Sequence, residues 1–142
     1  MEKLSFKIQI EAPPEKVWNV LWGEITYRQW TTAFTEGSFY EGTLEKGSIV
    51  KFFDPHQNGM YSRVEQNIPH KEMKFLHLGE IYNGIEVPQQ WGDATEAYLL
   101  EETEDGTELK TEIQAPEEFK SFFEEKFPAA MQIVKHLSEN QL

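Results

Sequence analysis

The chain has 142 residues, of which 39% are hydrophobic and 13% aromatic, and this apolar content predicts a single compact domain over residues 1–142. It contains no cysteine, which excludes disulfides, thiolate catalysis and cysteine-ligated zinc or iron–sulfur sites. The 25 acidic residues outnumber the 13 basic residues, and the formal net charge of -12 disfavours nucleic acid and anionic membrane surfaces as partners.

The N-terminal segment predicts a strand followed directly by a short helix. Residues 3–10 alternate apolar and polar side chains, as a half-buried strand does. We find no apolar run typical of a signal peptide or a membrane span, and we expect a cytoplasmic protein. The prolines of APPEKVWNVLW can open a helix, because proline at the first helical position lacks an N–H that has no partner there. We expect this helix to end at Gly23, with Trp18 and Trp22 facing inward.

The middle of the chain predicts one more short helix and then six strands. Tyr27, Trp30 and Phe34 recur at spacings of three and four residues, which predicts one to two helical turns within residues 25–34. The strand-like segments that follow are separated by clusters of Gly, Pro, Asn and Asp, as antiparallel hairpins require. These predicted strands cover residues 37–42, 48–54, 60–68, 72–82, 94–103 and 107–114.

The C-terminal segment predicts a long amphipathic helix with an interruption. Apolar side chains recur with a helical period from Phe119 to Leu137. Pro128 lies inside this pattern, where a proline removes one helical hydrogen bond. We therefore expect a break or kink, with helical segments at roughly residues 117–126 and 128–138.

The predicted order is strand, two short helices, six strands and a long helix, which is an α+β fold. Seven antiparallel strands have one apolar face to bury, and the C-terminal helix supplies a complementary apolar stripe. This order, with APPEKVWNVL after the first strand, RQW in the second helix, EDGTELKTEI before the last helix and MQIVKHLSE within it, resembles the START-like (SRPBCC) superfamily. The most similar branch is named for activators of heat-shock protein 90 ATPase. The resemblance spans nearly the whole chain, and PPEKVW and DGT are its most specific parts.

The resemblance implies a helix-grip fold, in which a curved, seven-stranded antiparallel sheet wraps around the C-terminal helix and leaves an elongated cavity between them. Members of the superfamily use that cavity to bind lipids, sterols, polyketides or plant hormones. A few catalyse cyclisation or dehydration inside it, and others act as co-chaperones. The fold by itself does not choose among these functions.

The histidines are the first candidates for chemistry, and they give no metal site. No two of the four have the spacing of helical metal ligands, so we expect no metal, no cofactor and no catalytic group recognisable from a motif. His77 follows Met73 and Phe75 on one side of a predicted strand and would project into the cavity as a polar handle or a proton shuttle. A register slip of one residue would instead turn His77 outward.

Aromatic and methionine side chains are the most abundant feature of the expected cavity. Such a lining suits an irregular apolar ligand, and a packed core without a usable void is the alternative. The residues expected to contact a ligand are Trp30, Phe34, Phe52, Met60, Met73, Phe75, His77, Tyr98, Phe123, Phe127 and Met131. Trp91, in the loop before the sixth predicted strand, is a candidate lid or partner anchor, unless that loop packs back onto the sheet.

Our leading hypothesis is that the protein binds a small hydrophobic molecule, lipid-like or aromatic, with His77 and Tyr98 supplying selectivity. One alternative is a co-chaperone-like partner of a heat-shock protein 90 type ATPase. Residues 96–125 are strongly acidic and would form either a solvated face or a docking surface for such a protein partner. A second alternative is an enzyme of the polyketide cyclase or dehydratase type, in which His77 would act with Tyr98 or Glu96.

Overall fold

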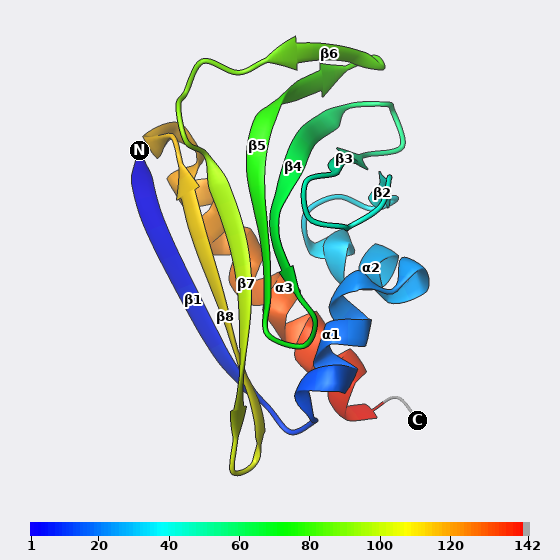
Figure 1. Ribbon diagram of the computed structural model, residues 1–142, viewed down its shortest axis with the longest axis vertical. Coiled ribbons are helices and arrows are strands. Elements are labelled where there is room, and N and C mark those ends of the chain that lie inside the picture. Colours follow the sequence, from blue (N-terminus) through cyan, green and yellow to red (C-terminus); the bar gives the residue numbers. More distant parts are fainter. Residues whose placement is uncertain (141–142) are drawn as a thin grey trace.

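The computed structural model of the protein describes residues 1–140 and consists of one curved antiparallel sheet with the helices on its concave face (Figure 1). Within these residues no helix is both long enough and apolar enough to cross a membrane. In chain order the elements are β1 (Glu2–Ile10), α1 (Pro14–Trp22), α2 (Glu24–Trp30), a 3₁₀ turn (Thr31–Ala33), β2 (Phe39–Glu41), β3 (Ile49–Phe53), β4 (Gly59–Ile68), β5 (Glu72–Tyr82), β6 (Ile85–Pro88), β7 (Thr95–Thr103), β8 (Gly106–Ala115), a second 3₁₀ turn (Glu117–Phe119) and α3 (Lys120–Asn140).

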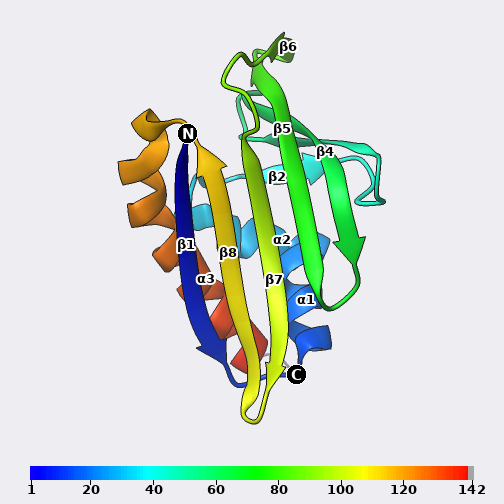
Figure 2. The ribbon, with the colours of Figure 1, turned by 60° about the vertical axis from the view of Figure 1, so that its left-hand side comes forward.

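The sheet places the first strand beside the last one. Its strand order is β1-β8-β7-β5-β4-β3-β2, and every pairing is antiparallel. Figure 2 shows α3 crossing behind β1, β8 and β7, with α1 and α2 beside it behind the neighbouring strands. The predicted α+β helix-grip architecture is therefore confirmed, with the C-terminal helix packed in the curve of the sheet.

One short strand was not predicted. β6 lies in the segment between residues 83 and 93, which its Gly, Pro and Asn content made a loop in the sequence analysis. All four of its residues are exposed, so it has no buried face and no alternating pattern. It forms because Asn83 and Gly84, both with positive φ, make a tight turn that folds it back onto the upper end of β5.

The two most specific sequence motifs meet in space. The segment before α1 passes over the turn between β7 and β8, where a Cβ atom on Gly106 would lie 2.2 Å from the carbonyl oxygen of Ile10. The hydroxyl of the fully buried Thr107 donates a hydrogen bond of 2.7 Å to the carbonyl oxygen of Ala12. The glycine allows the close approach and the threonine then satisfies a backbone carbonyl, which explains why this pair of residues follows the turn.

The first helix closes one end of the core, as predicted. It begins at Pro14 and ends at Trp22, directly before Gly23. Trp22 is buried, whereas Trp18 is only half-buried and packs edge-on against Trp22 with ring centroids 6.3 Å apart. Trp22 therefore faces the core fully and Trp18 covers its outer side.

The expected break of the helix at Pro128 was wrong. α3 runs without a break from Lys120 to Asn140, with Pro128 inside it. Proline lacks the backbone N–H that would donate to the carbonyl oxygen of Glu124. Pro128 and Glu124 are both exposed, so water can donate to that carbonyl instead. The buried neighbours Phe127 and Met131 hold the helix against the sheet on both sides of the proline. Packing on the buried face has therefore overridden the local preference.

Candidate functional site

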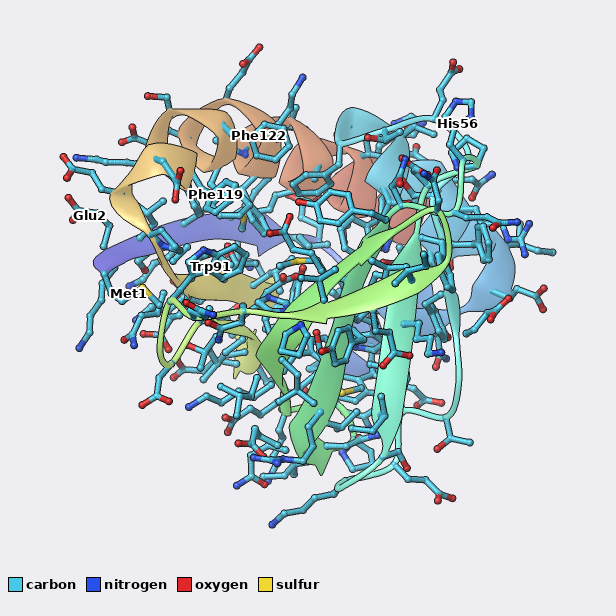
Figure 3. All side chains as sticks on the ribbon, turned by 90° about the horizontal axis from the view of Figure 1, so that it is seen from above. Met1, Glu2, His56, Trp91, Phe119 and Phe122 are labelled. Atoms are coloured by element: carbon cyan, nitrogen blue, oxygen red, sulfur yellow. The ribbon has the colours of Figure 1, made fainter. Side chains whose placement is uncertain are left out.

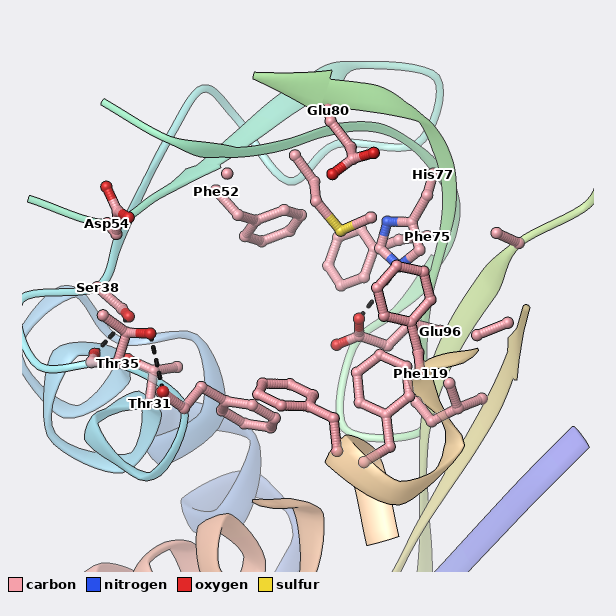
Figure 4. A pocket seen from close by; sticks show the side chains of 18 of the residues that line it. Thr31, Thr35, Ser38, Phe52, Asp54, Phe75, His77, Glu80, Glu96 and Phe119 are labelled. Carbon is pink, nitrogen blue, oxygen red and sulfur yellow. Dashed lines mark hydrogen bonds and ion pairs between the residues drawn. The ribbon is translucent and has the colours of Figure 1, made fainter. Parts of the chain in front are cut away.

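A cavity of about 430 Å³ lies between the concave face of the sheet, α2 and the start of α3 (Figure 4). Its walls combine residues of β3, β4, β5, β7 and β8 with residues from both 3₁₀ turns. Its volume falls within the roughly 300–1,000 Å³ that small-molecule sites occupy. The sheet and the C-terminal helix therefore do not pack completely against one another, and the expected alternative of a core without a void is not what the structure has.

β5 supplies one wall through its alternating pattern. Every second residue of this strand is buried on the concave side, and this set includes Phe75, His77 and Ile81, all of which line the cavity. The side chain of His77 therefore faces the cavity, and the alternative register that would turn it outward does not occur. The side chain of His77 is only 9% exposed, and Figure 4 shows its ring beside Phe75.

The structure gathers most of the predicted ligand-contacting residues around this cavity. Met73 and Met131 do not line it: both are buried in the core, and Met131 accepts a hydrogen bond from the hydroxyl of Thr111 through its sulfur. The predicted residues that do line the cavity are Trp30, Phe34, Phe52, Met60, Phe75, His77, Trp91, Tyr98, Phe123 and Phe127.

The aromatic side chains at the base of the cavity support one another. Trp22 packs edge-on against Tyr98 and Phe75, with ring centroids 5.0 and 5.6 Å away, and Phe52 packs edge-on against Phe75 at 5.1 Å. Edge-to-face contacts at these distances are favourable and hold the rings in fixed orientations. The apolar wall of the cavity is therefore preformed.

A chain of hydrogen bonds crosses this wall from β4 to β7. The Ser62 hydroxyl lies 2.7 Å from Nδ1 of His77, and Nε2 of His77 lies 3.2 Å from a carboxylate oxygen of Glu96. The other carboxylate oxygen of Glu96 accepts a short hydrogen bond from the Tyr98 hydroxyl. A neutral imidazole protonated at Nε2 satisfies every partner, because Ser62 then donates to Nδ1 and Nε2–H donates to Glu96.

The Glu96 carboxylate changes the ionisation of its aromatic neighbours. Burial raises the pKa of Tyr98 well above its ordinary value of 10.0, and the charge and hydrogen bond of Glu96 raise it further. Burial and then Glu96 also raise the pKa of Tyr27, which lines the same cavity. Both phenols therefore stay protonated at neutral pH and act as hydrogen-bond donors.

Comparisons with known proteins identify the fold. No family model and no curated protein matches the sequence. The solution structure of the Aha1 dimer from Colwellia psychrerythraea is similar, with 22% sequence identity and a TM-score of 0.77 over 99% of this chain and 98% of that chain. This chain has the helix-grip fold. The crystal structure of protein MLL2253 from Mesorhizobium loti is similar too, with 17% identity and a TM-score of 0.73 over 96% of both chains.

A third similar solved structure belongs to a longer chain. DynU16, a protein of the dynemicin biosynthetic locus, matches the whole of this chain with 11% identity and a TM-score of 0.70, and the match takes up 50% of its own length. At these identities the likeness extends to the fold and not to the function.

Within residues 1–140 of this helix-grip domain, no three His, Cys, Asp or Glu side chains are grouped so that they could hold a metal ion. Ser62 does not act as an exposed nucleophile either, because it is fully buried and does not line the cavity. It acts on the site by orienting the ring of His77. The chemistry that this arrangement offers is hydrogen bonding and proton exchange through His77, Glu96 and Tyr98.

Trp91 lies at the upper end of the helix-grip cavity. It lines the cavity and packs edge-on against Phe119, with ring centroids 5.5 Å apart (Figure 3). Its loop is also tied to the sheet, because the amide of Gln89 donates to the carbonyl of His77 and accepts from the backbone of Trp91 and Gly92. The loop therefore packs onto β5 while its tryptophan lines the cavity, and a role of Trp91 as a lid or partner anchor stays a prediction.

Glu96 is the site residue whose importance the sequence analysis missed. It was named only as a possible partner of His77, and the acidic composition of residues 96–125 made it one of many carboxylates. Its position two residues before Tyr98 on a strand would have placed both side chains on the same face. Its pairing opposite Phe75 depends on the register of β5 with β7, which local sequence does not reveal.

Other lining residues were missed for a different reason. The polar ones lie in turns or near strand ends, where no period marks the inward side, and they are Thr31, Ser38, Asp54, Glu80 and Gln114. The aromatic ones lie in segments whose helical period was recognised, but they were not among the residues expected to contact a ligand, and they are Trp22, Tyr27, Phe119 and Phe122.

Proposed function

We propose that the protein binds a small, largely hydrophobic molecule in the cavity between the sheet and α3. The observation that supports this is a preformed cavity of about 430 Å³ whose walls are mainly apolar and rich in aromatic side chains. A packed domain normally has few voids larger than a water molecule, so a space of this size has to be maintained against collapse. The edge-to-face contacts of Trp22, Phe75 and Phe52 maintain it.

Native mass spectrometry of gently purified protein tests this proposal directly. We expect a small molecule that leaves on denaturation, or one that is taken up from a mixture of lipids and aromatic metabolites. Bare protein under both conditions would overturn the proposal. The co-chaperone alternative would then come first, and it is tested by measuring the ATPase rate of a heat-shock protein 90 with and without this protein.

A matched pair of phenylalanine variants locates the binding site. Phe34 and Phe39 are both half-buried, but Phe34 lines the cavity and Phe39 packs outside it against Phe53. We expect Phe34→Ala to weaken uptake about tenfold or more, since it removes apolar contact worth roughly 1.5–3 kcal/mol. Phe39→Ala should leave uptake nearly unchanged at a similar loss of stability. Equal uptake by both variants would place the ligand elsewhere.

The hydrogen-bonded pair of His77 and Glu96 favours a second candidate function, an enzyme of the cyclase or dehydratase type. A histidine beside a carboxylate can accept and return a proton inside an apolar cavity. Incubation with the ligand found by native mass spectrometry tests this candidate. A rearranged or dehydrated product that His77→Gln no longer forms, while still binding the ligand, would support it, and an unchanged ligand would leave binding alone.

A further inference from the structure

Apart from His77, which is charged only when protonated, the ionised side chains that line the cavity all have the same sign. They are Asp54, Glu80 and Glu96, and no lysine or arginine lines the cavity among residues 1–140. Figure 4 shows these three carboxylates on different sides of the space, with Glu96 next to His77. An apolar cavity that contains only negative charges disfavours fatty acids and phosphorylated ligands and favours a cation.

Glu96 is the one of the three carboxylates that is hydrogen-bonded to His77. Its side chain is 24% exposed, and its partners His77 and Tyr98 donate hydrogen bonds without neutralising its charge when the imidazole is neutral. No lysine or arginine of the described chain forms an ion pair with it. Each carboxylate oxygen of Glu96 has one of these hydrogen bonds and can accept another, so Glu96 still has acceptor capacity.

The other two carboxylates surround the wider part of the cavity. Backbone N–H groups of His56 and Asn58 bond Asp54 at 2.7 and 3.0 Å, and against the opposing effect of burial they hold its pKa below the ordinary value. Glu80 accepts a hydrogen bond of 2.6 Å from the hydroxyl of Tyr82. All of these partners are neutral donors, so they leave the negative charge in place.

Three of the uncharged polar side chains of the lining are engaged with the backbone. Thr31 donates to the carbonyl of Tyr27 at 2.6 Å, Ser38 to the carbonyl of Thr35 at 2.6 Å, and Gln114 to the carbonyl of Asp93 at 2.7 Å. Neutral donors remain at Trp22, whose indole Nε1 is buried without a hydrogen-bond partner, and at the protonated phenol of Tyr27. The carboxylates are the groups of the lining that offer a ligand a full charge, and they are acceptors.

From these observations, and resting on the proposed function, we infer that the ligand is a protonated organic amine with an apolar or aromatic body. Its ammonium group would donate to Glu96, where the carboxylate supplies a charge-assisted hydrogen bond. Its body would lie against the aromatic walls, and the faces of Trp30 and Tyr27 add a favourable interaction with a nearby cation. The net charge of -12 attracts the same class of ligand at long range.

Three probes with the same phenyl-alkyl group distinguish a cationic, a neutral and an anionic ligand, and they are 4-phenylbutylamine, 4-phenylbutanol and 4-phenylbutyrate. We expect calorimetric titration at neutral pH to show the amine binding about tenfold or more tightly than the alcohol, as a charge-assisted hydrogen bond allows, and the carboxylate binding weakest. Glu96→Gln should reduce the preference for the amine over the alcohol to a few-fold, because it removes the negative charge that distinguishes the two probes.

Glu101→Gln is the matched control, because Glu101 lies on the same strand, loses the same charge on substitution, is exposed and does not line the cavity. It should retain the preference for the amine. If the wild-type protein binds the alcohol or the carboxylate as tightly as the amine, the inference is overturned while the proposed function stands. If none of the three probes binds and native mass spectrometry shows bare protein, both are overturned.

Discussion

Ser62 shows how a single buried hydroxyl supports the site without lining it. It is fully buried, and its hydroxyl lies 2.7 Å from Nδ1 of His77, on the side of the ring away from Glu96. If this hydroxyl were removed, Nδ1 of His77 would be buried without a hydrogen-bond partner. The ring would also lose one of the two hydrogen bonds that orient it.

We therefore expect Ser62→Ala to lower the free energy of unfolding by about 1–3 kcal/mol, the usual penalty for a buried polar group left unsatisfied. Urea denaturation followed by tryptophan fluorescence measures this change. Ser48→Ala is the control, since the Ser48 hydroxyl bonds Thr43 at an exposed position and should change stability by less than about 0.5 kcal/mol. Equal losses of stability in both variants would show that the hydrogen bond to His77 contributes no more than the exposed hydrogen bond of Ser48.

Residue patterns predicted one part of the site well and another part not at all. The period of two along β5 placed Phe75 and His77 on the concave face, and the structure has them there. The pairing of Phe75 with Glu96 comes from the contact of two strands that are separated by β6 and its loops. No local pattern contains that information, and so the carboxylate of the site was not singled out.

At the scale of elements, α3 is the clearest case of tertiary packing overriding a local signal. Its apolar period predicted a helix, and Pro128 predicted an interruption that the structure does not show. The burial of Phe127, Ala130, Met131 and Val134 against the sheet stabilises the helix on both sides of the proline. β6 is the opposite case, since its strand geometry comes only from pairing with β5.

We expect Pro128→Ala to raise the free energy of unfolding by about 1–3 kcal/mol, because it restores one helical hydrogen bond and removes the steric conflict of the ring in the preceding turn. Thermal unfolding monitored by circular dichroism tests this expectation. Ala129→Ser, at the adjacent exposed position, should change stability by less than about 1 kcal/mol. A loss of stability in Pro128→Ala would mean that the proline ring itself packs favourably in this helix.

At the scale of the whole molecule, Glu139 links the end of the chain to its beginning. One of its carboxylate oxygens accepts a hydrogen bond of 2.8 Å from the backbone N–H of Glu11 and one of 2.6 Å from Lys135. Lys135 also donates to the carbonyl of Gln9 at 2.9 Å. The end of α3 is thereby attached to the segment between β1 and α1, which closes the domain on the side away from Trp91.

This link makes stability depend on pH in a defined direction. The hydrogen bond from Glu11, followed by that from Lys135, lowers the pKa of Glu139 below its ordinary value of 4.5. A carboxyl group with a lowered pKa in the folded state stabilises the fold above its unfolded pKa, and the contribution disappears as the pH falls through the folded value. The stabilisation is thus complete at neutral pH and lost in acid.

We therefore expect the wild-type protein to be more stable than Glu139→Gln at pH 7, and the difference between them to shrink steadily as the pH falls below 4.5. Urea denaturation at a series of pH values measures it. Glu125→Gln, an exposed carboxyl on the same helix, should show no such pH-dependent difference. A constant difference between wild type and Glu139→Gln at all pH values would contradict the assignment.

The sequence by itself determined the order of the elements and their inward faces, which follow from periods of two and 3.6 residues that each segment carries on its own. The helix-grip class was what the resemblance of the sequence to a known superfamily implied. Only the tertiary structure decided that α3 continues through Pro128, that β6 adds an eighth strand, and that Glu96 meets His77 in a cavity that remains open. These features depend on strand register and on packing between distant segments, and such contacts exist only once the whole chain has folded.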